Sequence, residues 1–557
     1  MNKIIWPVLA GVILQILSSF SLAAEPVKTP SPNFLVIVVD DMGFSDLGSF
    51  GGEIETPNLD ELAYGGVRFT DFQVAPACSP TRAMLLTGVD NHLAGLGNLA
   101  EETSPNQKGQ PGYEGHLNDR VVSVAETLRK RGYRTYLSGK WHMGLKPEHG
   151  PKHHGFDRSF TMLSGGASHF KDMQPAYSTD PNAVAPYLDE GEVISRLPEG
   201  FEYSSQYYVD RMIDYMQQDQ DSKQPFFAVL AYTAPHWPLQ APDDAIAKYA
   251  RRYDAGYDAL FHQRRQRMKE LGLLAADAPE PPRPPKAVPW ESLDKDTQRV
   301  QSRAMAVYAA MIDQVDVHTG RLVDYLKKTG QFDNTVIVFM SDNGPEGHDL
   351  DETWSPQMFP KIRAVIDERF DHSEANMGRP NSYTLYGAGW ARAGSPHLRM
   401  YKAFSSEGGV RVAAFAHAPG RIPAGTILHQ NLSVKDIAPT LLDFAGIASA
   451  QEKGKLPMQG VSVRAALQAP ASWGGVDRAL GIELLGKYGL RYGQWKLLNL
   501  PPPYGSGKAE LYNLELDPGE SQNLAAREPQ MMEKMLGLWE SYASDNGVIL
   551  PDWVSGY

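Results

Sequence analysis

Residues 33–43, NFLVIVVDDMG, decide the fold of this 557-residue chain. The apolar part of the run is largely β-branched and shows no alternation, which is typical of a strand buried on both faces in a parallel sheet under helices. The run stops at Asp40 and Asp41, ahead of Gly43, where we expect the strand to break. Ligands of open α/β sheets bind beyond the carboxyl ends of the strands. This stretch therefore predicts a buried strand that leads into a functional site.

Two later runs have the same character as the first. Residues 226–230 (FFAVL) end shortly before His236, and residues 335–340 (TVIVFM) end shortly before Asp342 and Asn343. Three buried strands that finish in reactive side chains predict one shared site. Between the second and third runs, apolar residues at helical spacing predict a long helix; they are Met305, Tyr308, Ile312, Val315, Leu322 and Leu326. The alternation predicts an α/β fold with a large mixed, mostly parallel sheet sandwiched by helices.

The pattern changes after about residue 450. Short strand-like pieces at 490–492, 495–498 and 510–514 are separated by Gly, Pro and Asp turns, and a final helix is expected at about 529–544. These elements predict a smaller α+β domain built on a short antiparallel sheet. We therefore expect a large catalytic domain over residues 30–450 and this C-terminal domain over residues 451–557.

The N-terminus has the layout of a secretory signal peptide over residues 1–24. Lys3 precedes an almost wholly apolar stretch, and Ser21-Leu22-Ala23 places small residues where a signal peptidase reads. The alternative is an uncleaved membrane anchor, but the apolar stretch is short for a membrane span. We expect an exported protein, periplasmic or secreted, that has no contact with the membrane after cleavage.

Charge and cysteine content limit the range of possible functions. The formal net charge of −13 disfavours non-specific nucleic-acid binding, which relies on basic surface. The single cysteine, Cys78, excludes an internal disulfide. A lone thiol is more often buried and inert than reactive, but the neighbours of this one reverse that expectation.

Residues 78–82 (CSPTR) predict the start of a helix. Proline is favoured at the first helical position and serine can cap just before it, so we expect Ser79 to cap and Pro80 to open the helix. Cys78 would then lie at the helix N-terminus, where free amides and the helix dipole favour anions. Arg82 follows about one turn later and can point back to the same place. The pattern indicates an activated nucleophile beside an anion site.

The surrounding sequence resembles the type I, formylglycine-dependent sulfatases, members of the alkaline phosphatase-like superfamily. Residues 78–88 (CSPTRAMLLTG) and 132–142 (GYRTYLSGKWH) are similar to the two signatures of that family. Residues 234–240 (APHWPLQ) make the resemblance closest to bacterial arylsulfatases. Lys402 precedes residues 406–412 (SEGGVRV), which resemble a further family segment, and Ala413 stands where many members have proline.

A metal site is expected where the first and third runs end. Asp40, Asp41, Asp342 and Asn343 are hard oxygen donors, which suit calcium or magnesium and disfavour zinc. An Asp-Asp pair at a strand end is by itself more often a solvated turn, but a second carboxylate–amide pair favours a metal. The family uses these four positions for one Ca²⁺, so the resemblance implies the same ion here.

The resemblance also implies the chemistry. A maturation enzyme oxidises Cys78 to formylglycine, one hydroxyl of the hydrated aldehyde attacks sulfur, and Asp342 orients or deprotonates that hydroxyl. His142 then takes the proton of the second hydroxyl, and sulfate leaves as the aldehyde re-forms. The remaining positions would stabilise charge on oxygen near the sulfate and the leaving group: Arg82, Lys140, His236 and Lys402. The substrate is expected to be a small-molecule sulfate ester, and the protein a monomer.

Two other functions compete with an arylsulfatase-type sulfuric ester hydrolase. The first is a phosphonate monoester or phosphodiester hydrolase of the same superfold; the second signature and Lys402 favour sulfate. The other is a non-catalytic, calcium-dependent protein that binds sulfated ligands and keeps Cys78 as a thiol. Every expected catalytic position is filled, which favours an enzyme.

Overall fold

The stretch that begins at residue 33 forms β1 (Asn33–Val39), in the middle of a ten-stranded sheet. β1 pairs in parallel with β9 (Thr335–Ser341) on one side and with β8 (Phe226–Ala231) on the other, as expected for a strand buried on both faces. β4 (Arg134–Lys140) and β5 (Arg158–Met162) extend the parallel part, and antiparallel strands lie toward both edges. The full spatial order is β11 (Thr426–Leu428), β2 (Val67–Phe69), β10 (Ala414–His417), β9, β1, β8, β4, β5, β6 (Tyr187–Asp189) and β7 (Glu192–Ile194).

The computed structural model describes residues 31–448 and 452–553. The predicted signal peptide, residues 1–24, lies outside the described residues. Across the two described ranges, no helix has the length and apolarity needed to cross a membrane.

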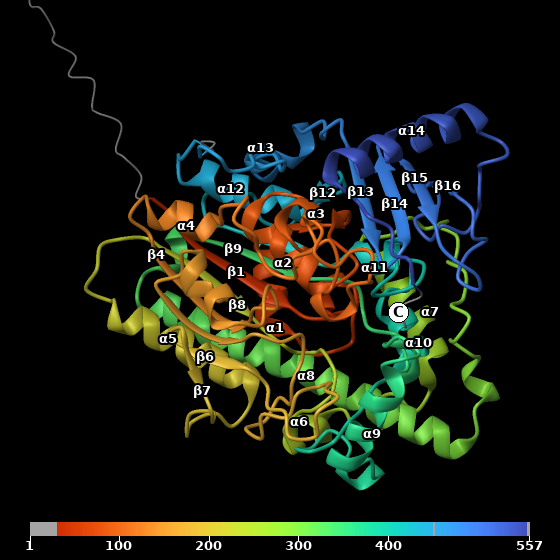
Figure 1. Cartoon of the computed structure of the whole chain (residues 1–557), viewed down its shortest axis with the longest axis horizontal. Coiled ribbons are helices and arrows are strands. Elements are labelled where there is room, and N and C mark those ends of the chain that lie inside the picture. The colour runs from red at the N-terminus through yellow and green to blue at the C-terminus, as the bar shows by residue number, and fades with distance from the viewer. Residues whose placement is uncertain (1–30, 449–451, 554–557) are drawn as a thin grey trace, which may run out of the picture.

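Helices cover both faces of the large sheet (Figure 1). Alternate side chains of β1 divide between two hydrophobic clusters, because successive residues of a strand point to opposite faces. Leu35 and Ile37 pack in the cluster that contains α8, and Val36 and Val38 pack in the cluster that contains α2. The helices are α1 (Pro57–Tyr64), α2 (Cys78–Thr87), α3 (Asn91–Ala94), α4 (Val124–Arg129), α5 (Ser204–Gln218), α6 (Asp243–Lys248), α7 (Gly256–Glu270), α8 (Lys295–Lys328), α9 (Phe359–Arg369), α10 (Gly387–Gly394), α11 (Glu407–Val410), α12 (Ile437–Phe444), α13 (Arg464–Gln468) and α14 (Pro529–Asn546).

The long helix predicted before the third run is α8, and every residue of its predicted stripe is buried. Tyr308 does more than fill the core, because its hydroxyl donates a hydrogen bond to Asp46 Oδ2 at 2.6 Å and accepts one from the Gly43 amide. The helix thus braces the segment that follows β1.

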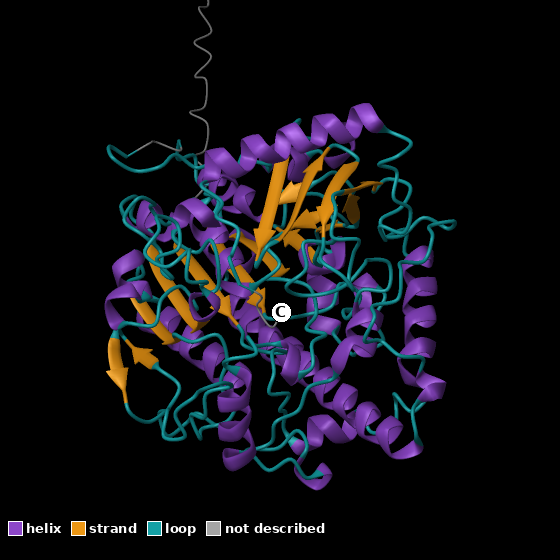
Figure 2. Cartoon of the chain, turned by 45° about the vertical axis from the view of Figure 1, so that its right-hand side comes forward, coloured by secondary structure: helices purple, strands orange, loops and turns teal. Residues whose placement is uncertain are grey.

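A second, four-stranded antiparallel sheet forms the C-terminal part, as predicted. Its strands are β13 (Ala479–Leu484), β14 (Lys487–Tyr492), β15 (Trp495–Asn499) and β16 (Glu510–Asn513). Figure 2 shows α14 lying across one face of this sheet, where Leu490 and Leu497 pack against Met535 and Trp539. The sequence analysis missed β13, because Gly481 interrupts its apolar pattern; a Cβ there would lie 2.2 Å from the Tyr542 ring.

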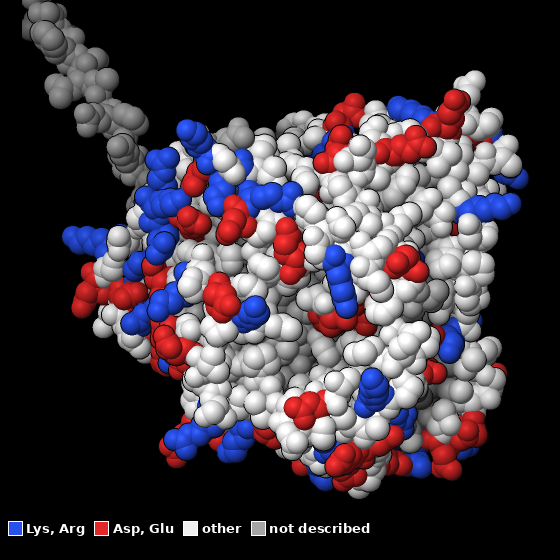
Figure 3. Space-filling view, viewed as in Figure 1, with Lys and Arg blue, Asp and Glu red and all other residues white. Residues whose placement is uncertain are grey.

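The other face of the small sheet packs against the catalytic part of the chain through buried ion pairs. Lys496 on β15 contacts Glu407 at 2.8 Å, with both side chains fully buried, and Arg491 on β14 contacts Asp71 at 3.0 Å. By contrast, acidic and basic side chains are intermixed over the outer face drawn in Figure 3.

Candidate active site

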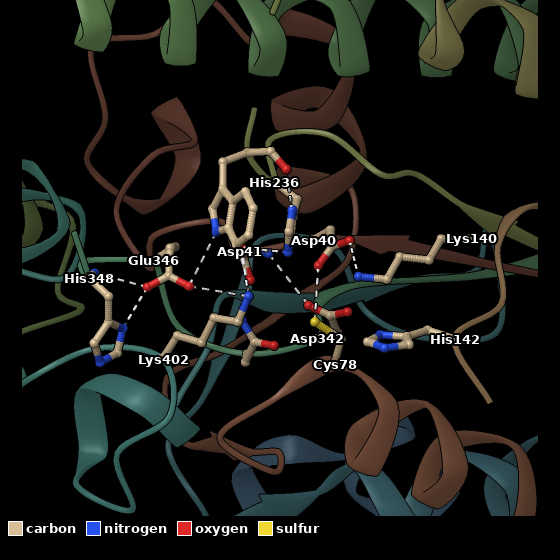
Figure 4. A network of polar contacts seen from close by, with 12 residues as sticks. Asp40, Asp41, Cys78, Lys140, His142, His236, Asp342, Glu346, His348 and Lys402 are labelled. Carbon is tan, nitrogen blue, oxygen red and sulfur yellow. Dashed lines mark hydrogen bonds and ion pairs between the residues drawn. The ribbon is translucent and has the colours of Figure 1, made fainter. Parts of the chain in front are cut away.

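Four adjacent parallel strands, β9, β1, β8 and β4, end at one edge of the large sheet. This register brings together the side chains at their carboxyl ends, as expected from three apolar runs that finish in polar residues. Figure 4 shows the resulting network from close by. The residues that these strand ends supply are Asp342 and Asn343 after β9, Asp40 and Asp41 after β1, His236 after β8, and Lys140 and His142 at the end of β4.

The two adjacent aspartates face the same site because the chain turns sharply at Asp41. That residue has φ +68°, in the left-handed region, so β1 breaks there and not at Gly43 as the sequence analysis expected. Gly43 has a different role, since a Cβ at this position would lie 2.7 Å from the Gly394 backbone. A strained backbone at Asp41 is typical of functional positions that their surroundings hold in place.

Cys78 is the first residue of α2, so its expected place at a helix N-terminus is confirmed. The expected cap is wrong: Ala77 is the N-cap residue, and the buried Ser79 hydroxyl has no hydrogen-bond partner within residues 31–448 and 452–553. Thr81 anchors this turn, because its hydroxyl accepts a hydrogen bond from the Ala75 amide at 2.9 Å. The helix therefore begins earlier than Pro80.

The Cys78 thiol points at the acidic cluster and donates to Asp40 Oδ1 at 3.4 Å. It is 2% exposed. Burial, followed by the neighbouring Asp40 carboxylate, raises the pKa of the thiol well above its ordinary value. A thiol in this environment stays protonated and is a poor nucleophile.

The acidic cluster fits a hard divalent cation. The Asn343 side chain donates to Asp41 Oδ1 at 2.7 Å, while its own buried Oδ1 has no hydrogen-bond partner in the described part of the chain. Burial, together with Asp40 and the other nearby carboxylates, raises the pKa of Asp41 to about 8. An orphaned amide oxygen and carboxylates crowded into a buried space are the donor set that Ca²⁺ or Mg²⁺ takes. The four residues expected to bind metal, Asp40, Asp41, Asp342 and Asn343, thus lie in one cluster.

Three cations surround these carboxylates. Arg82 donates from Nε and Nη2 to Asp342 Oδ2, at 2.9 and 2.7 Å. Lys140 Nζ donates to Asp40 Oδ2 at 2.6 Å, and Lys402 Nζ donates to Asp41 Oδ2 at 3.0 Å. All three are buried, so the site concentrates positive charge inside an acidic protein. Burial opposes ionisation of Asp40, but the positive charges of Lys140, Arg82 and Lys402 outweigh it and hold the pKa of that carboxyl below its usual range.

The two predicted histidines lie at different places around the cluster. His236 Nε2 is 3.6 Å from Asp41 Oδ2, and its Nδ1 donates to the Trp237 carbonyl at 2.6 Å. Burial and Lys402 lower the pKa of His236 well below its ordinary value, so the ring is neutral. In Figure 4 the ring of His142 extends toward Cys78 from the side opposite Lys402. All of the predicted site residues therefore converge.

The sequence analysis missed a group of residues just outside this set. Glu346 contacts Lys402 Nζ at 3.3 Å and His348 Nδ1 at 2.6 Å, and it accepts a weaker contact from the Trp237 indole. Glu101 lies beside His142. The proximity of Glu346 to Asn343 in sequence was the one available signal; Glu101 comes from a segment with no periodic pattern.

This geometry is typical of a hydrolase that acts on an anionic ester: a buried position at a helix N-terminus, an acidic cluster suited to a divalent cation, and several buried cations around that cluster. Comparison with known proteins identifies the family. The sulfatase family model matches residues 32–447, so the chain belongs to the sulfatase family and is a sulfuric ester hydrolase, as the sequence predicted.

Individual relatives agree with this assignment. The chain is 39% identical over 553 residues to an uncharacterized sulfatase of Schizosaccharomyces pombe, which covers 95% of this chain and 96% of the relative. It is also 39% identical over 472 residues to an arylsulfatase of Klebsiella aerogenes, covering 84% and 97% of the two chains. Among solved structures, Ps i-CgsB in complex with k-i-k-neocarrahexaose matches with a TM-score of 0.64 and 25% identity, over 94% of this chain and 95% of that one.

Proposed function

We propose that this sulfatase cleaves aryl sulfate esters, with Cys78 converted to formylglycine and one Ca²⁺ bound by Asp40, Asp41, Asp342 and Asn343. The observation that carries the proposal is the position of Cys78, whose sulfur is 3.4 Å from a carboxylate of the acidic cluster, among buried cations. The arylsulfatase of Klebsiella aerogenes supports the choice of ester.

Conversion of Cys78 is supported by the state of the unmodified thiol. Its raised pKa leaves almost no thiolate at neutral pH, and the thiolate is the nucleophilic form. Formylglycine would supply, as its hydrate, one hydroxyl that attacks sulfur and a second through which sulfate is released. Because the folded protein buries Cys78, the maturation enzyme must reach residues 78–82 before folding is complete.

A bound Ca²⁺ would supply positive charge to the sulfate oxygens and to the attacking hydroxyl. It would also offset the repulsion among the buried carboxylates, which adds to the effect of burial in raising the pKa of Asp41. The buried Asn343 Oδ1 would gain the partner that the described residues do not give it.

Each of the other side chains in the site has its own role in the proposed reaction. Asp342, held by Arg82, takes the proton of the attacking hydroxyl as its oxygen bonds to sulfur and the S–O bond to the leaving group breaks. Lys402, with His236 beside it, faces the departing oxygen and gives it a proton. Lys140 reaches from Asp40 toward the sulfate.

After the attack on sulfur, His142 is placed to accept the proton of the remaining hydroxyl of a formylglycine hydrate, which would let sulfate leave as the aldehyde re-forms. Burial and Lys140 lower the pKa of His142, although Glu101 opposes them, so its ring is neutral and able to act as this base. We further propose that the chain is exported, consistent with the signal peptide predicted for residues 1–24. We also propose that the exported protein is a monomer.

The test is the mass of the peptide that contains residue 78, from protein purified from its native host. Conversion of thiol to aldehyde lowers the mass by about 18 Da. We expect that loss, together with turnover of an aryl sulfate that Cys78→Ala abolishes. Ser79→Ala is the matched control. It should leave turnover unchanged, because none of the residues that the structure describes bonds to the Ser79 hydroxyl. An unmodified thiol in active protein would overturn the formylglycine proposal.

A further inference from the structure

Glu101 lies against His142, in the 3-10 helix Ala100–Glu102. His142 Nε2 donates to Glu101 Oε1 at 3.1 Å, and the Tyr177 hydroxyl donates to the same oxygen at 2.7 Å. The His142 and Glu101 side chains are 6% and 19% exposed. A charge-assisted hydrogen bond in such a place fixes the orientation of the ring.

The contact also fixes which ring nitrogen carries the proton. A carboxylate only accepts hydrogen bonds, so Nε2 of the neutral His142 ring holds the hydrogen and Nδ1 keeps its lone pair. Nδ1 is buried and has no hydrogen-bond partner among the described residues. The ring points toward Cys78 (Figure 4), so the free lone pair lies in the part of the ring available for the reaction.

The backbone is shaped to allow this arrangement. His142 has φ +54°, a left-handed conformation that a non-glycine residue adopts at a cost. Gly165 leaves room on the other side: a Cβ there would lie 2.2 Å from the Tyr177 hydroxyl and 2.7 Å from His142 Cε1. The contact among Glu101, Tyr177 and His142 therefore depends on the backbone conformation of His142 and on the absence of a side chain at Gly165.

We propose that Glu101, held by Tyr177, is a positioning residue that orients His142 and stabilises the imidazolium formed when His142 accepts a proton. The inference rests on the proposed function, in which His142 is the base that releases sulfate. It resembles the way a buried carboxylate supports the histidine of a hydrolase triad, where it holds the tautomer and stabilises the charged ring.

The sign of the effect on pH dependence follows from the charges that face His142. Lys140 and Arg82 are positive and lower its pKa, burial acts in the same direction, and Glu101 is the negative group that raises it. Turnover that needs unprotonated His142 rises with pH through that pKa. If Glu101 becomes neutral, the pKa falls and the acid limb of the kcat profile moves to lower pH.

The experiment compares kcat against pH for wild type, Glu101→Gln and Tyr177→Phe with an aryl sulfate. Glutamine keeps an acceptor for Nε2 and removes the charge, so we expect kcat to fall by about tenfold or more with little change in KM, and the acid limb to move to lower pH. Tyr177→Phe removes a donor from Glu101 and strengthens the remaining contact, so its acid limb should move to higher pH. A purely structural role would shift neither limb.

Glu102→Gln is the matched control on the same turn. Burial and Glu101 raise the pKa of Glu102 to about 8, so glutamine replaces an acid that is mostly neutral at pH 7, and no contact of Glu102 with His142 exists in the structure. We expect this variant to keep the wild-type profile. Unchanged kcat and an unshifted limb in Glu101→Gln, with active wild type, would overturn the inference. If Glu101→Gln does not fold, an unshifted limb in Tyr177→Phe would overturn it. Inactive wild type with an unmodified Cys78 would instead undo the proposed function.

Discussion

His92 joins the two parts of the chain through a buried charge cluster that should make stability depend on pH. Its Nδ1 lies 3.0 Å from Asp90, next to α3, and its Nε2 lies 3.0 Å from Glu483 on β13. Both carboxylates and the ring are buried. Burial alone would lower the pKa of His92, but the hydrogen bonds and charges of Asp90 and Glu483 outweigh it and raise the pKa from 6.5 to about 9.

The size of the effect follows from that shift. At about 1.4 kcal/mol per pKa unit, the rise in the pKa of His92 corresponds to a contribution of roughly 3 kcal/mol to the free energy of unfolding. Because the folded-state pKa is raised, this contribution is fully present below pH 6.5, the unfolded value, and is lost as pH rises through about 9. His92→Gln should therefore destabilise the protein most at low pH, where the wild-type ring is charged.

The assay is urea unfolding of wild type and His92→Gln, each with saturating Ca²⁺, at about pH 6 and about pH 10. We expect a difference in the free energy of unfolding near 3 kcal/mol at the lower pH and a much smaller one at the higher pH. His153→Gln, at an exposed histidine, is the control and should show no difference at either pH. A His92→Gln difference that is equal at both pH values would refute the reasoning.

Two further predictions concern the cation and the domain interface. Asn343→Ala removes the orphaned amide oxygen, so the Ca²⁺ concentration needed for half-maximal thermal stabilisation should rise by about tenfold or more; an unchanged titration would exclude Asn343 as a ligand. Lys496→Met leaves the Glu407 carboxylate buried without its cation, which should cost about 3–5 kcal/mol in urea unfolding. The double variant with Glu407→Gln should recover much of that loss, and no recovery would contradict the pairing.

The central sheet was predictable because its strands are buried on both faces and so carry continuous apolar runs. β1 and β9 could be read directly, and the polar residues at their ends predicted where the site lies. β13 was not predictable from such a pattern, because Gly481 is required by the approach of the Tyr542 ring. That requirement comes from α14, which lies far along the chain.

The residues of the site likewise fall into those that the sequence predicted and those that it did not. Residues that follow strand ends, such as Asp40 and Asp342, are placed by strand register, which the sequence encodes locally. Glu101, on the 3-10 helix Ala100–Glu102, contacts His142, and Tyr177 contacts Glu101. The positions of both residues depend on tertiary packing. The left-handed backbone of Asp41 also had no local signal, since the neighbouring Gly43 is the residue that ordinarily marks such a break.

The small C-terminal sheet helps to hold the proposed active site in place. The turn between β13 and β14 places Leu484 and Leu485 in one cluster with Ala77 and Ala403, the neighbours of Cys78 and Lys402. These two segments of the proposed active site are distant in sequence, and the same hairpin packs against both. The Ser405 hydroxyl also donates to the Lys487 carbonyl at 2.7 Å, which ties the Lys402 segment to β14. A displacement of this hairpin would move the residues proposed as nucleophile and leaving-group cation together, so the buried ion pairs that hold the sheet in place also support the geometry of the proposed active site.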